Sequence, residues 1–150
     1  MTAPIFNFRN VKLRIPNGDP LVVYSVASYS NTNPNTTLPL GVDPTEVSIV
    51  LLTVQCANIT GNISQGAPAR KTINLSVWIE NSGIRNYLVN DYTIIPNNAF
   101  DPLNGNIIMS SGDSLRVQVS NPASETTNTA ITNCVDVTVS LLEIANATAA

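Results

Sequence analysis

The sequence contains no histidine. Histidine is the commonest general base and metal ligand, so its absence excludes Ser-His and Cys-His nucleophile pairs and most hydrolase mechanisms. Two carboxylates could still act together, as in glycosidases, and the candidates are Asp91, Asp101, Asp113 and Asp136. Each of them has a simpler expected role beside a turn, in a loop or on the wet side of a strand. We therefore expect no catalytic residues and no enzyme activity.

Charged residues are also few. They make up 11% of the chain, against about 25% in a typical soluble domain. Because charged side chains are depleted from the centres of protein interfaces, this composition is typical of a chain that assembles with copies or neighbours. A soluble β-domain with a surface rich in Asn and Thr explains it equally well. The net charge of -3 argues against nucleic acid as a partner.

The chain has only two cysteines, Cys56 and Cys134, too few for a disulfide scaffold or a cysteine zinc site. We expect two small buried side chains, and a bridge between neighbouring strands is the less favoured alternative in a reducing cytoplasm. There is no regular series of carboxylates for calcium and no glycine-rich loop opening a helix for phosphate, so no metal and no cofactor are expected.

Met1 is not followed by a basic and apolar leader, and no run reaches the roughly 20 apolar residues of a membrane span. We expect neither export by a standard signal nor membrane anchorage.

Helical periodicity is absent, and apolar and polar residues alternate instead. Strands are expected at about Phe6–Ile15, Leu21–Ser28, Glu46–Ala57, Lys71–Glu80, Arg85–Val89, Tyr92–Ile95, Asn106–Met109, Asp113–Ser120 and Thr132–Ile144. Turn residues such as Asn81-Ser82-Gly83 and Ser111-Gly112-Asp113 separate them. This pattern predicts an all-β fold over residues 1–150: one antiparallel β-sandwich, jelly-roll-like, of eight or nine strands, with an N-terminal strand or arm.

Three alternating segments are expected to form the core, with their apolar side chains meeting across two sheets: Ile73–Ile79, Leu115–Val119 and Val135–Leu141. In Val47–Val54 the apolar residues fall on both sides. That segment is the expected central strand, either covered on both faces or lying at a subunit contact. Leu141–Ile144 breaks the alternation, which predicts a β-bulge there.

The remaining segments are candidates for contact with a partner. Residues 1–20 are expected to form an arm or a hairpin, and residues 29–45 and 121–131 long surface loops. Arg9, Lys12 and Arg14 would suit an acidic neighbour, although the same charges also protect a solvated edge strand, which is the commoner arrangement. Trp78 falls on the polar side of its strand, where it would anchor a protein, stack on a sugar or be covered by a loop.

The candidate interface residues are Phe6, Phe8, Arg9, Lys12, Arg14, Tyr29, Trp78 and Tyr87.

Between Glu46 and Ile144 the chain contains, in order, VQCANIT, NLSVWIENSGIRNYLV, IIPNNAFDPLNGNIIMSSGDSLRVQVS and VDVTVSLLEI. This order of elements resembles small β-sandwich virion proteins of tailed bacteriophages, which are capsid decoration or cement proteins and neck or tail accessories. The resemblance implies a non-enzymatic structural protein of the virion, assembled in the cytoplasm of the bacterial host. It also implies that the SGDSL turn leads into a core strand without a catalytic role.

The first expectation for function is a capsid decoration protein that binds the major capsid protein or other virion proteins, as a homo-oligomer with a trimer favoured. A neck or tail accessory is the second. The third is a carbohydrate-binding module for host recognition, with Trp78 and Tyr87 as stacking platforms. Nucleic acid and membrane are not expected as partners.

Overall fold

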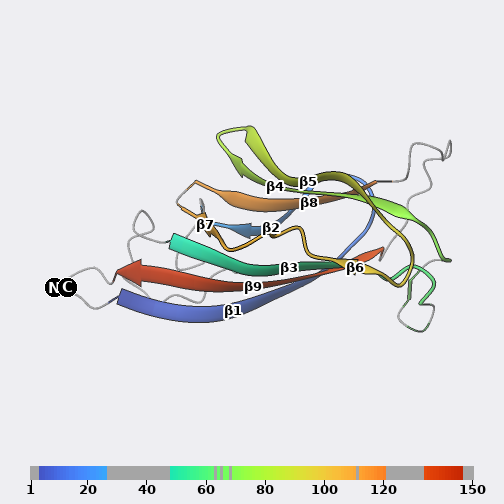
Figure 1. Cartoon of the computed structure of the whole chain (residues 1–150), viewed down its shortest axis with the longest axis horizontal. Coiled ribbons are helices and arrows are strands. Elements are labelled where there is room, and N and C mark those ends of the chain that lie inside the picture. Colours follow the sequence, from blue (N-terminus) through green and yellow to red (C-terminus); the bar gives the residue numbers. More distant parts are fainter. Residues whose placement is uncertain are drawn as a thin grey trace.

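The computed structural model (Figure 1) describes residues 4–26, 48–62, 64, 66–67, 69–110, 112–120 and 134–146. In these residues the chain is built from strands without an α-helix, which confirms the all-β class. The strands are β1 Pro4–Ile15, β2 Leu21–Ser25, β3 Ser48–Asn58, β4 Ile73–Asn81, β5 Ile84–Ile94, β6 Ala99–Phe100, β7 Ile107–Met109, β8 Ser114–Ser120 and β9 Val135–Asn146.

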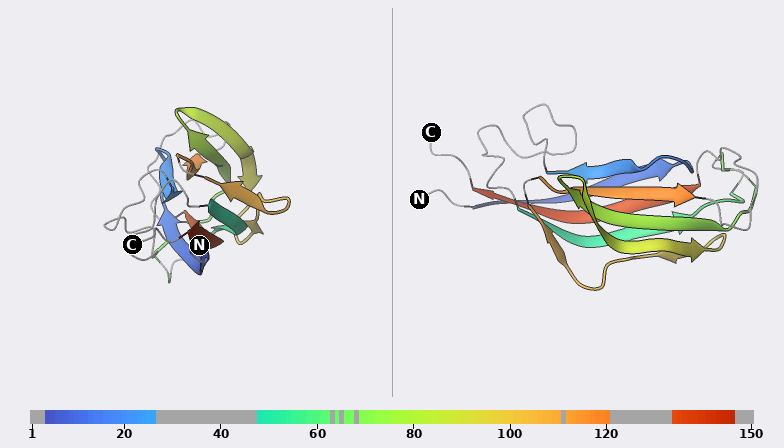
Figure 2. Two further views of the ribbon diagram at one scale, coloured as in Figure 1. Left: turned by 90° about the vertical axis from the view of Figure 1, so that its left-hand side faces the viewer. Right: turned by 90° about the horizontal axis from the view of Figure 1, so that it is seen from above.

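The strands form two antiparallel sheets. Sheet A has the order β1-β9-β3-β6, and β7 also pairs with β3; sheet B has the order β2-β8-β4-β5. Viewed along the strands, the two sheets face each other across a common interior (Figure 2). The predicted β-sandwich is therefore confirmed, and β3 lies inside its sheet as expected.

Alternation along the strands builds the core. Val137 and Leu141 of β9 point inward from sheet A, while Leu75 and Val117 point inward from sheet B, and all four are at most 1% exposed. Burying one such side chain contributes about 1.5 to 3 kcal/mol relative to leaving it exposed. The three segments predicted to form the core do so, with Ile79 packed against it from the partly buried shell.

Two strands differ from the expectation. Residues 84–94 form one strand, where the sequence indicated two, because bulges keep β5 paired with β4 past Asp91, whose φ is 52°. In the sequence, the polar pair Asn90-Asp91 looks like a turn. The two-residue strand β6 was not expected, since a segment this short carries no alternation.

The predicted bulge in β9 is wrong. Residues 135–144 alternate strictly between buried and half-buried, which places Glu143 on the inner side of the sandwich. The irregularity lies in β3 instead, where the register with β9 shifts between Leu51 and Thr53. A buried glutamate looks like a break in an apolar face, and the sequence offers no sign of its hydrogen-bond partners.

The N-terminal segment is a strand and not a free arm. Every residue of β1 is paired with β9, from Pro4 with Asn146 to Ile15 with Val135. The chain then turns and enters sheet B as β2, so β1 and β2 do not form a hairpin within one sheet. The expected loops at residues 29–45 and 121–131 lie outside the described residues.

Cys56 and Cys134 are buried and unbonded, as expected for two small core side chains. Burial raises the pKa of the Cys56 thiol to about 12, and Asp101 adds to the shift. The described part of the chain contains no helix that is long and apolar enough to span a membrane.

Candidate interface on the outer face of sheet A

The outer face of sheet A is formed by the side chains that point away from the core on β1, β9, β3 and β7. On β1 these are Phe6, Phe8, Asn10, Lys12 and Arg14. The register places one residue of each neighbouring strand beside each of them, so the outer face is organised in rows that run across the strands.

One row is apolar throughout. Phe8 lies beside Leu142, Leu142 beside Val50, and Val50 beside Ile108. Phe8 is 76% exposed and Ile108 69%, while Leu142 and Val50 are half-buried. Phe6, 60% exposed, and Ile144 extend this apolar patch toward the end of the sheet where β1 begins and β9 ends. A contiguous exposed apolar patch of this kind is typical of a contact surface.

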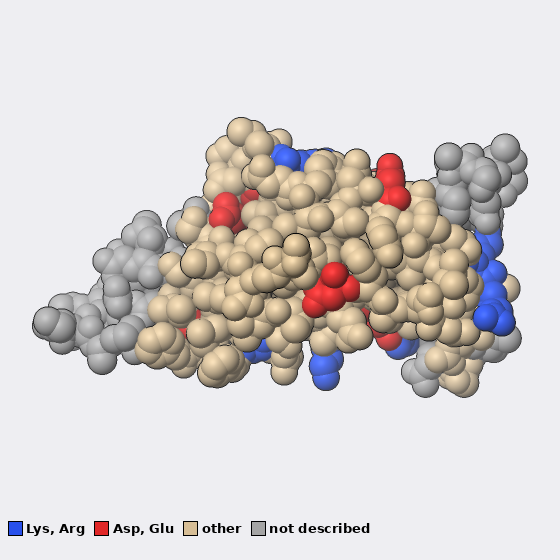
Figure 3. Space-filling view, in the orientation of Figure 1, with Lys and Arg blue, Asp and Glu red and all other residues tan. Residues whose placement is uncertain are grey.

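The rows beyond it are polar. Asn10, Ser140 and Thr53 follow, with Ser140 Oγ donating to Asn10 Oδ1 at 2.7 Å. Next comes the row that contains Lys12, Thr138 and Gln55. Figure 3 shows that charged groups are few over β1, β9 and β3.

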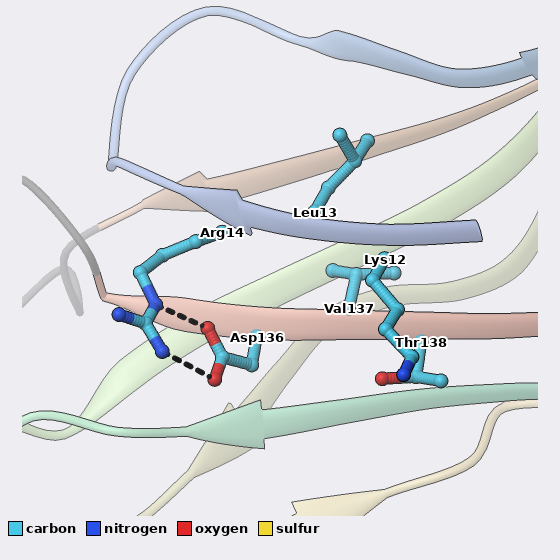
Figure 4. A pocket seen from close by; sticks show the side chains of 6 residues that line it. All are labelled: Lys12, Leu13, Arg14, Asp136, Val137 and Thr138. Atoms are coloured by element: carbon cyan, nitrogen blue, oxygen red, sulfur yellow. Dashed lines mark hydrogen bonds and ion pairs between the residues drawn. The ribbon is translucent and has the colours of Figure 1, made fainter. Parts of the chain in front are cut away.

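Arg14 and Asp136 form an ion pair on this face. Arg14 Nε and Nη2 donate to the two carboxylate oxygens at 2.7 and 3.0 Å, a bidentate geometry. Hydrogen bonding to Asp136 raises the pKa of Arg14 above its usual value. Figure 4 shows Lys12 and Arg14 extending to one side of β1 and Leu13 to the other. The positive charge of Arg14 is therefore neutralised locally.

Two shallow hollows lie on the polar half of the outer face. One, of about 360 Å³, lies over β1 and β9 and is lined by Lys12, Arg14, Asp136 and Thr138 among others. The second, of about 330 Å³, lies over β3 and β6. It is lined by Thr53, Gln55, Ala99, Phe100 and Asp101.

Asp101 gives the second hollow its acidic group. It directly follows β6, where Phe100 pairs with Cys56, and it lines the same hollow as Gln55. Asp101 Oδ1 accepts from the backbone nitrogen of Leu103 at 2.8 Å and from that of Val54 at 3.4 Å. Among the described residues, its Oδ2 atom has no hydrogen bond, which leaves it available to a partner.

The predicted cluster of three cations does not exist as one patch. Arg9 lies on the opposite side of β1 from Phe8 and Asn10; it is half-buried, and its Nη1 atom is buried. Lys12 and Arg14 remain on the outer face. Three charges close in sequence are split because successive side chains of a strand point to opposite faces.

Trp78 is not an exposed anchor, because its side chain is 0% exposed. It lies on the outer side of sheet B, where neighbouring side chains cover it. The Arg85 guanidinium lies 4.6 Å from the ring centre, the Tyr87 ring 5.5 Å from it, and Trp78 Nε1 donates to Glu80 at 3.4 Å. Tyr87 itself is 46% exposed. Tyr29 lies outside the described residues.

The sequence predicted Phe6 and Phe8 as interface candidates but not Val50, Ile108 and Leu142, which the structure places in the same patch. One signal was present, since the apolar residues on both sides of Val47–Val54 indicated a strand with a second covered face. Nothing in the sequence shows that Phe8 lies beside Leu142, because the two residues are 134 positions apart in the chain. Contacts of this kind depend on strand order.

Three of the four acidic residues weighed as catalytic candidates have side-chain contacts with a structural role, and the fourth, Asp91, donates its backbone nitrogen to Ser76 Oγ at 3.0 Å. Asp113 Oδ2 accepts from the backbone nitrogen of Ser110 at 2.9 Å, and its Oδ1 accepts from Asn81 Nδ2 at 2.8 Å. Asp136 holds Arg14, and Asp101 binds backbone nitrogens. Within the described residues, no three His, Cys, Asp or Glu side chains are grouped as a metal site requires.

No protein-family model matches this sequence, and no curated protein is significantly similar to it. Among solved structures, similarity is found to a chain of infectious bursal disease virus, Gx strain, with a TM-score of 0.40 and 8% identity over 97% of this chain. The Gt strain of the same virus gives a TM-score of 0.40 and 8% identity, also over 97% of this chain. This chain spans only 37% and 38% of those two chains.

Proposed function

We propose that this chain is a non-enzymatic structural protein of a tailed-phage virion, and that the outer face of sheet A is the surface by which it is held in the particle. Decoration of the capsid, in contact with the major capsid protein, is the first form of this proposal. A neck or tail accessory is the second. The TM-score of 0.40 to the two virus structures is too low to carry the argument, which rests on the surface and on the resemblance of the sequence.

The observation that supports the proposal is the apolar row on a solvent-facing sheet. Phe6, Phe8 and Ile108 are each at least 60% exposed, and half-buried Val50, Leu142 and Ile144 fill the space between them. Aromatic residues surrounded by uncharged polar groups, with charges at the margin, are the usual composition of an interface core and rim. The low charge of the chain has a physical role in this arrangement, since charged groups are costly to desolvate.

Carbohydrate binding has less support. A stacking platform must present the face of an aromatic ring to the sugar, and the Trp78 ring is fully covered by Arg85 and Tyr87. Tyr87 remains partly exposed but lies against that buried ring. The aromatic side chains that are most accessible, Phe6 and Phe8, belong to the apolar row on the opposite sheet.

The proposal is tested by co-sedimentation with shells of the virus that encodes the chain, prepared without it. The wild type is expected to sediment with the shells, and Phe8→Ser to remain in the supernatant. Because Phe8 is 76% exposed, this change should alter folding stability by less than about 0.5 kcal/mol. Ile84→Ser removes a side chain that is 66% exposed on sheet B and serves as the matched control.

Failure of the wild type to sediment would refute the virion role. Equal sedimentation of Phe8→Ser and wild type would instead show that the contact lies elsewhere on the molecule.

A further inference from the structure

We propose that the outer face of sheet A binds the same face of a second copy, related by a two-fold axis that runs parallel to the strands between β9 and β3. This proposal rests on the proposed function in that it keeps the outer face as a protein contact within the particle, but it makes a second copy, and not the major capsid protein, the direct occupant of that face. It replaces the trimer favoured from the sequence with a face-to-face dimer.

The order of strands makes the outer face suited to such an axis. β9 and β3 lie at the centre of sheet A, β1 flanks them on one side, and β6 and β7 flank them on the other. A two-fold axis between β9 and β3 therefore places β1 of one copy over β6 and β7 of the second. Contacts across such an axis occur twice, because each copy supplies both halves of the surface.

The apolar row matches itself under this rotation. Its order across the sheet is Phe8, Leu142, Val50, Ile108. Reversing the row places Phe8 over Ile108 of the second copy and Leu142 over Val50 of the second copy. Four apolar positions of the face would thus be buried together, as side chains are between the sheets of a sandwich.

The charged row matches itself as well. Lys12, Thr138 and Gln55 lie in one row, and Asp101, the residue after β6, lines a hollow together with Gln55 and so extends that row. Reversal places Lys12 over Asp101 of the second copy, at both ends of the contact. Among the described residues Lys12 has no ion pair, and Asp101 Oδ2 has no hydrogen bond. Each charge therefore gains its complement from the second copy.

The twist of sheets does not prevent this pairing. Packed sheets are turned by about 30° relative to each other, which shifts the rows most at the margins of the contact. Lys12 lies at such a margin, and its long flexible side chain can absorb the offset. The apolar pair Leu142 and Val50 lies next to the axis, where the shift is smallest.

The available area is sufficient for a dimer. A strand of 12 residues such as β1 is roughly 40 Å long, and four strands side by side are roughly 15 Å across. The fourth position is filled only by the short strands β6 and β7 and the residues between them, so the flat area is at most roughly 600 Å². Side-chain relief brings the accessible area toward the roughly 800 Å² per partner of a standard interface. A two-fold axis perpendicular to the strands fits less well. Placed at the middle of the face, it stacks the apolar row of one copy on the charged row of the second. Placed at the apolar row, it lets the two copies overlap at only one end of the face.

The test is a charge exchange followed by sedimentation equilibrium of the free chain over a concentration series. The wild type is expected to dimerise. Lys12→Asp and Asp101→Lys, each studied alone, should raise the dissociation constant by about tenfold or more, because like charges then face each other at both ends. Mixing the two variants places opposite charges at both pairs and should restore dimers of mixed composition.

A second exchange avoids the backbone hydrogen bonds of Asp101. Phe8→Asp and Ile108→Lys change two highly exposed side chains, so both variants should fold, which circular dichroism checks. Each alone should be monomeric, and their mixture should form dimers. A monomeric wild type, or mixtures of both kinds that stay monomeric, would overturn the dimer.

Comparing the oligomeric state of the wild type with its co-sedimentation with shells distinguishes the dimer from the proposed virion role. A monomeric wild type that still sediments with shells would remove the dimer and leave the virion role. A wild type that dimerises but does not sediment with shells would leave the dimer and remove the virion role.

Discussion

Glu143 is a carboxylate inside the core of the sandwich, where an unpaired charge would be strongly destabilising. Its side chain is 0% exposed. Tyr24 donates its hydroxyl to Glu143 Oε2 at 3.0 Å, and Asn7 Nδ2 donates to Oε1 at 2.9 Å. Tyr24 comes from β2 in sheet B and Asn7 from β1 in sheet A, so this polar cluster joins the two sheets at their common edge.

We expect Tyr24→Phe to lower the free energy of unfolding by about 1.5 to 3 kcal/mol, because it removes a hydrogen bond to a buried charged group. Urea denaturation followed by circular dichroism measures the change. Tyr92→Phe is the matched control, since Tyr92 is 42% exposed and should lose little. A change in Tyr24→Phe no larger than in the control would contradict the role given to this hydrogen bond.

At the scale of single elements, the turn before β8 shows how a short polar segment fixes a strand. The backbone nitrogen of Asp113 donates to Ser110 O at 3.0 Å, and the Asp113 side chain closes the turn on the Ser110 nitrogen. Gly112 has a φ of +95°, which is unfavourable for residues with a Cβ. The turn thus positions Ser114 and the core residues that follow it, and its aspartate acts on the backbone.

Gly112→Ala is expected to destabilise the fold more than Gly105→Ala does. Both glycines have positive φ, but a Cβ at position 112 would lie 2.9 Å from Asn81 Nδ2. A Cβ at position 105 would have no neighbouring atom within 4 Å. The backbone strain alone costs about 1 to 2 kcal/mol, and displacement of Asn81 from Asp113 adds to it. Thermal melts of the two variants compare them directly, and equal melting temperatures would show that Asn81 moves away freely.

At the scale of the whole molecule, sheet A has an inner face that holds the core and an outer face that keeps exposed apolar residues. Sheet B also exposes apolar side chains, such as Ile84 and Tyr87, but its Trp78 is buried and covered by side chains of its own chain. On the outer face of sheet A, the row of Phe8, Leu142, Val50 and Ile108 has no such cover among the described residues. That row is the physical reason for proposing that this chain is a component of an assembly.

The copy number per virion separates the two forms of the proposed function. A decoration protein that covers a capsid is expected in hundreds of copies, whereas a neck or tail accessory is expected in about a dozen or fewer, because the symmetry of the site sets the number of equivalent positions. Quantitative mass spectrometry of purified virions measures it. Absence of the chain from virions would contradict both forms.

Local pattern determined the strands. Residues 115–119 and 135–141 alternate because one side must be buried and the other wetted, and that requirement acts within a few residues. The alternation therefore predicted the all-β class, the core and most strand bounds without knowledge of strand order. The alternation did not predict how Glu143 is buried, because its partners Tyr24 and Asn7 lie more than 100 positions away in the sequence.

The candidate interface, by contrast, was decided by tertiary structure. Phe8, Val50, Ile108 and Leu142 form one row only because strand order and register bring β1, β9, β3 and β7 side by side. The register of the neighbouring strand β5 sets Tyr87 beside Trp78, whereas the side of β1 on which Arg9 lies follows from local alternation. Alternation is a local property of the chain, but which side chains share a surface depends on pairing between distant strands, and that is settled only when the sheets form.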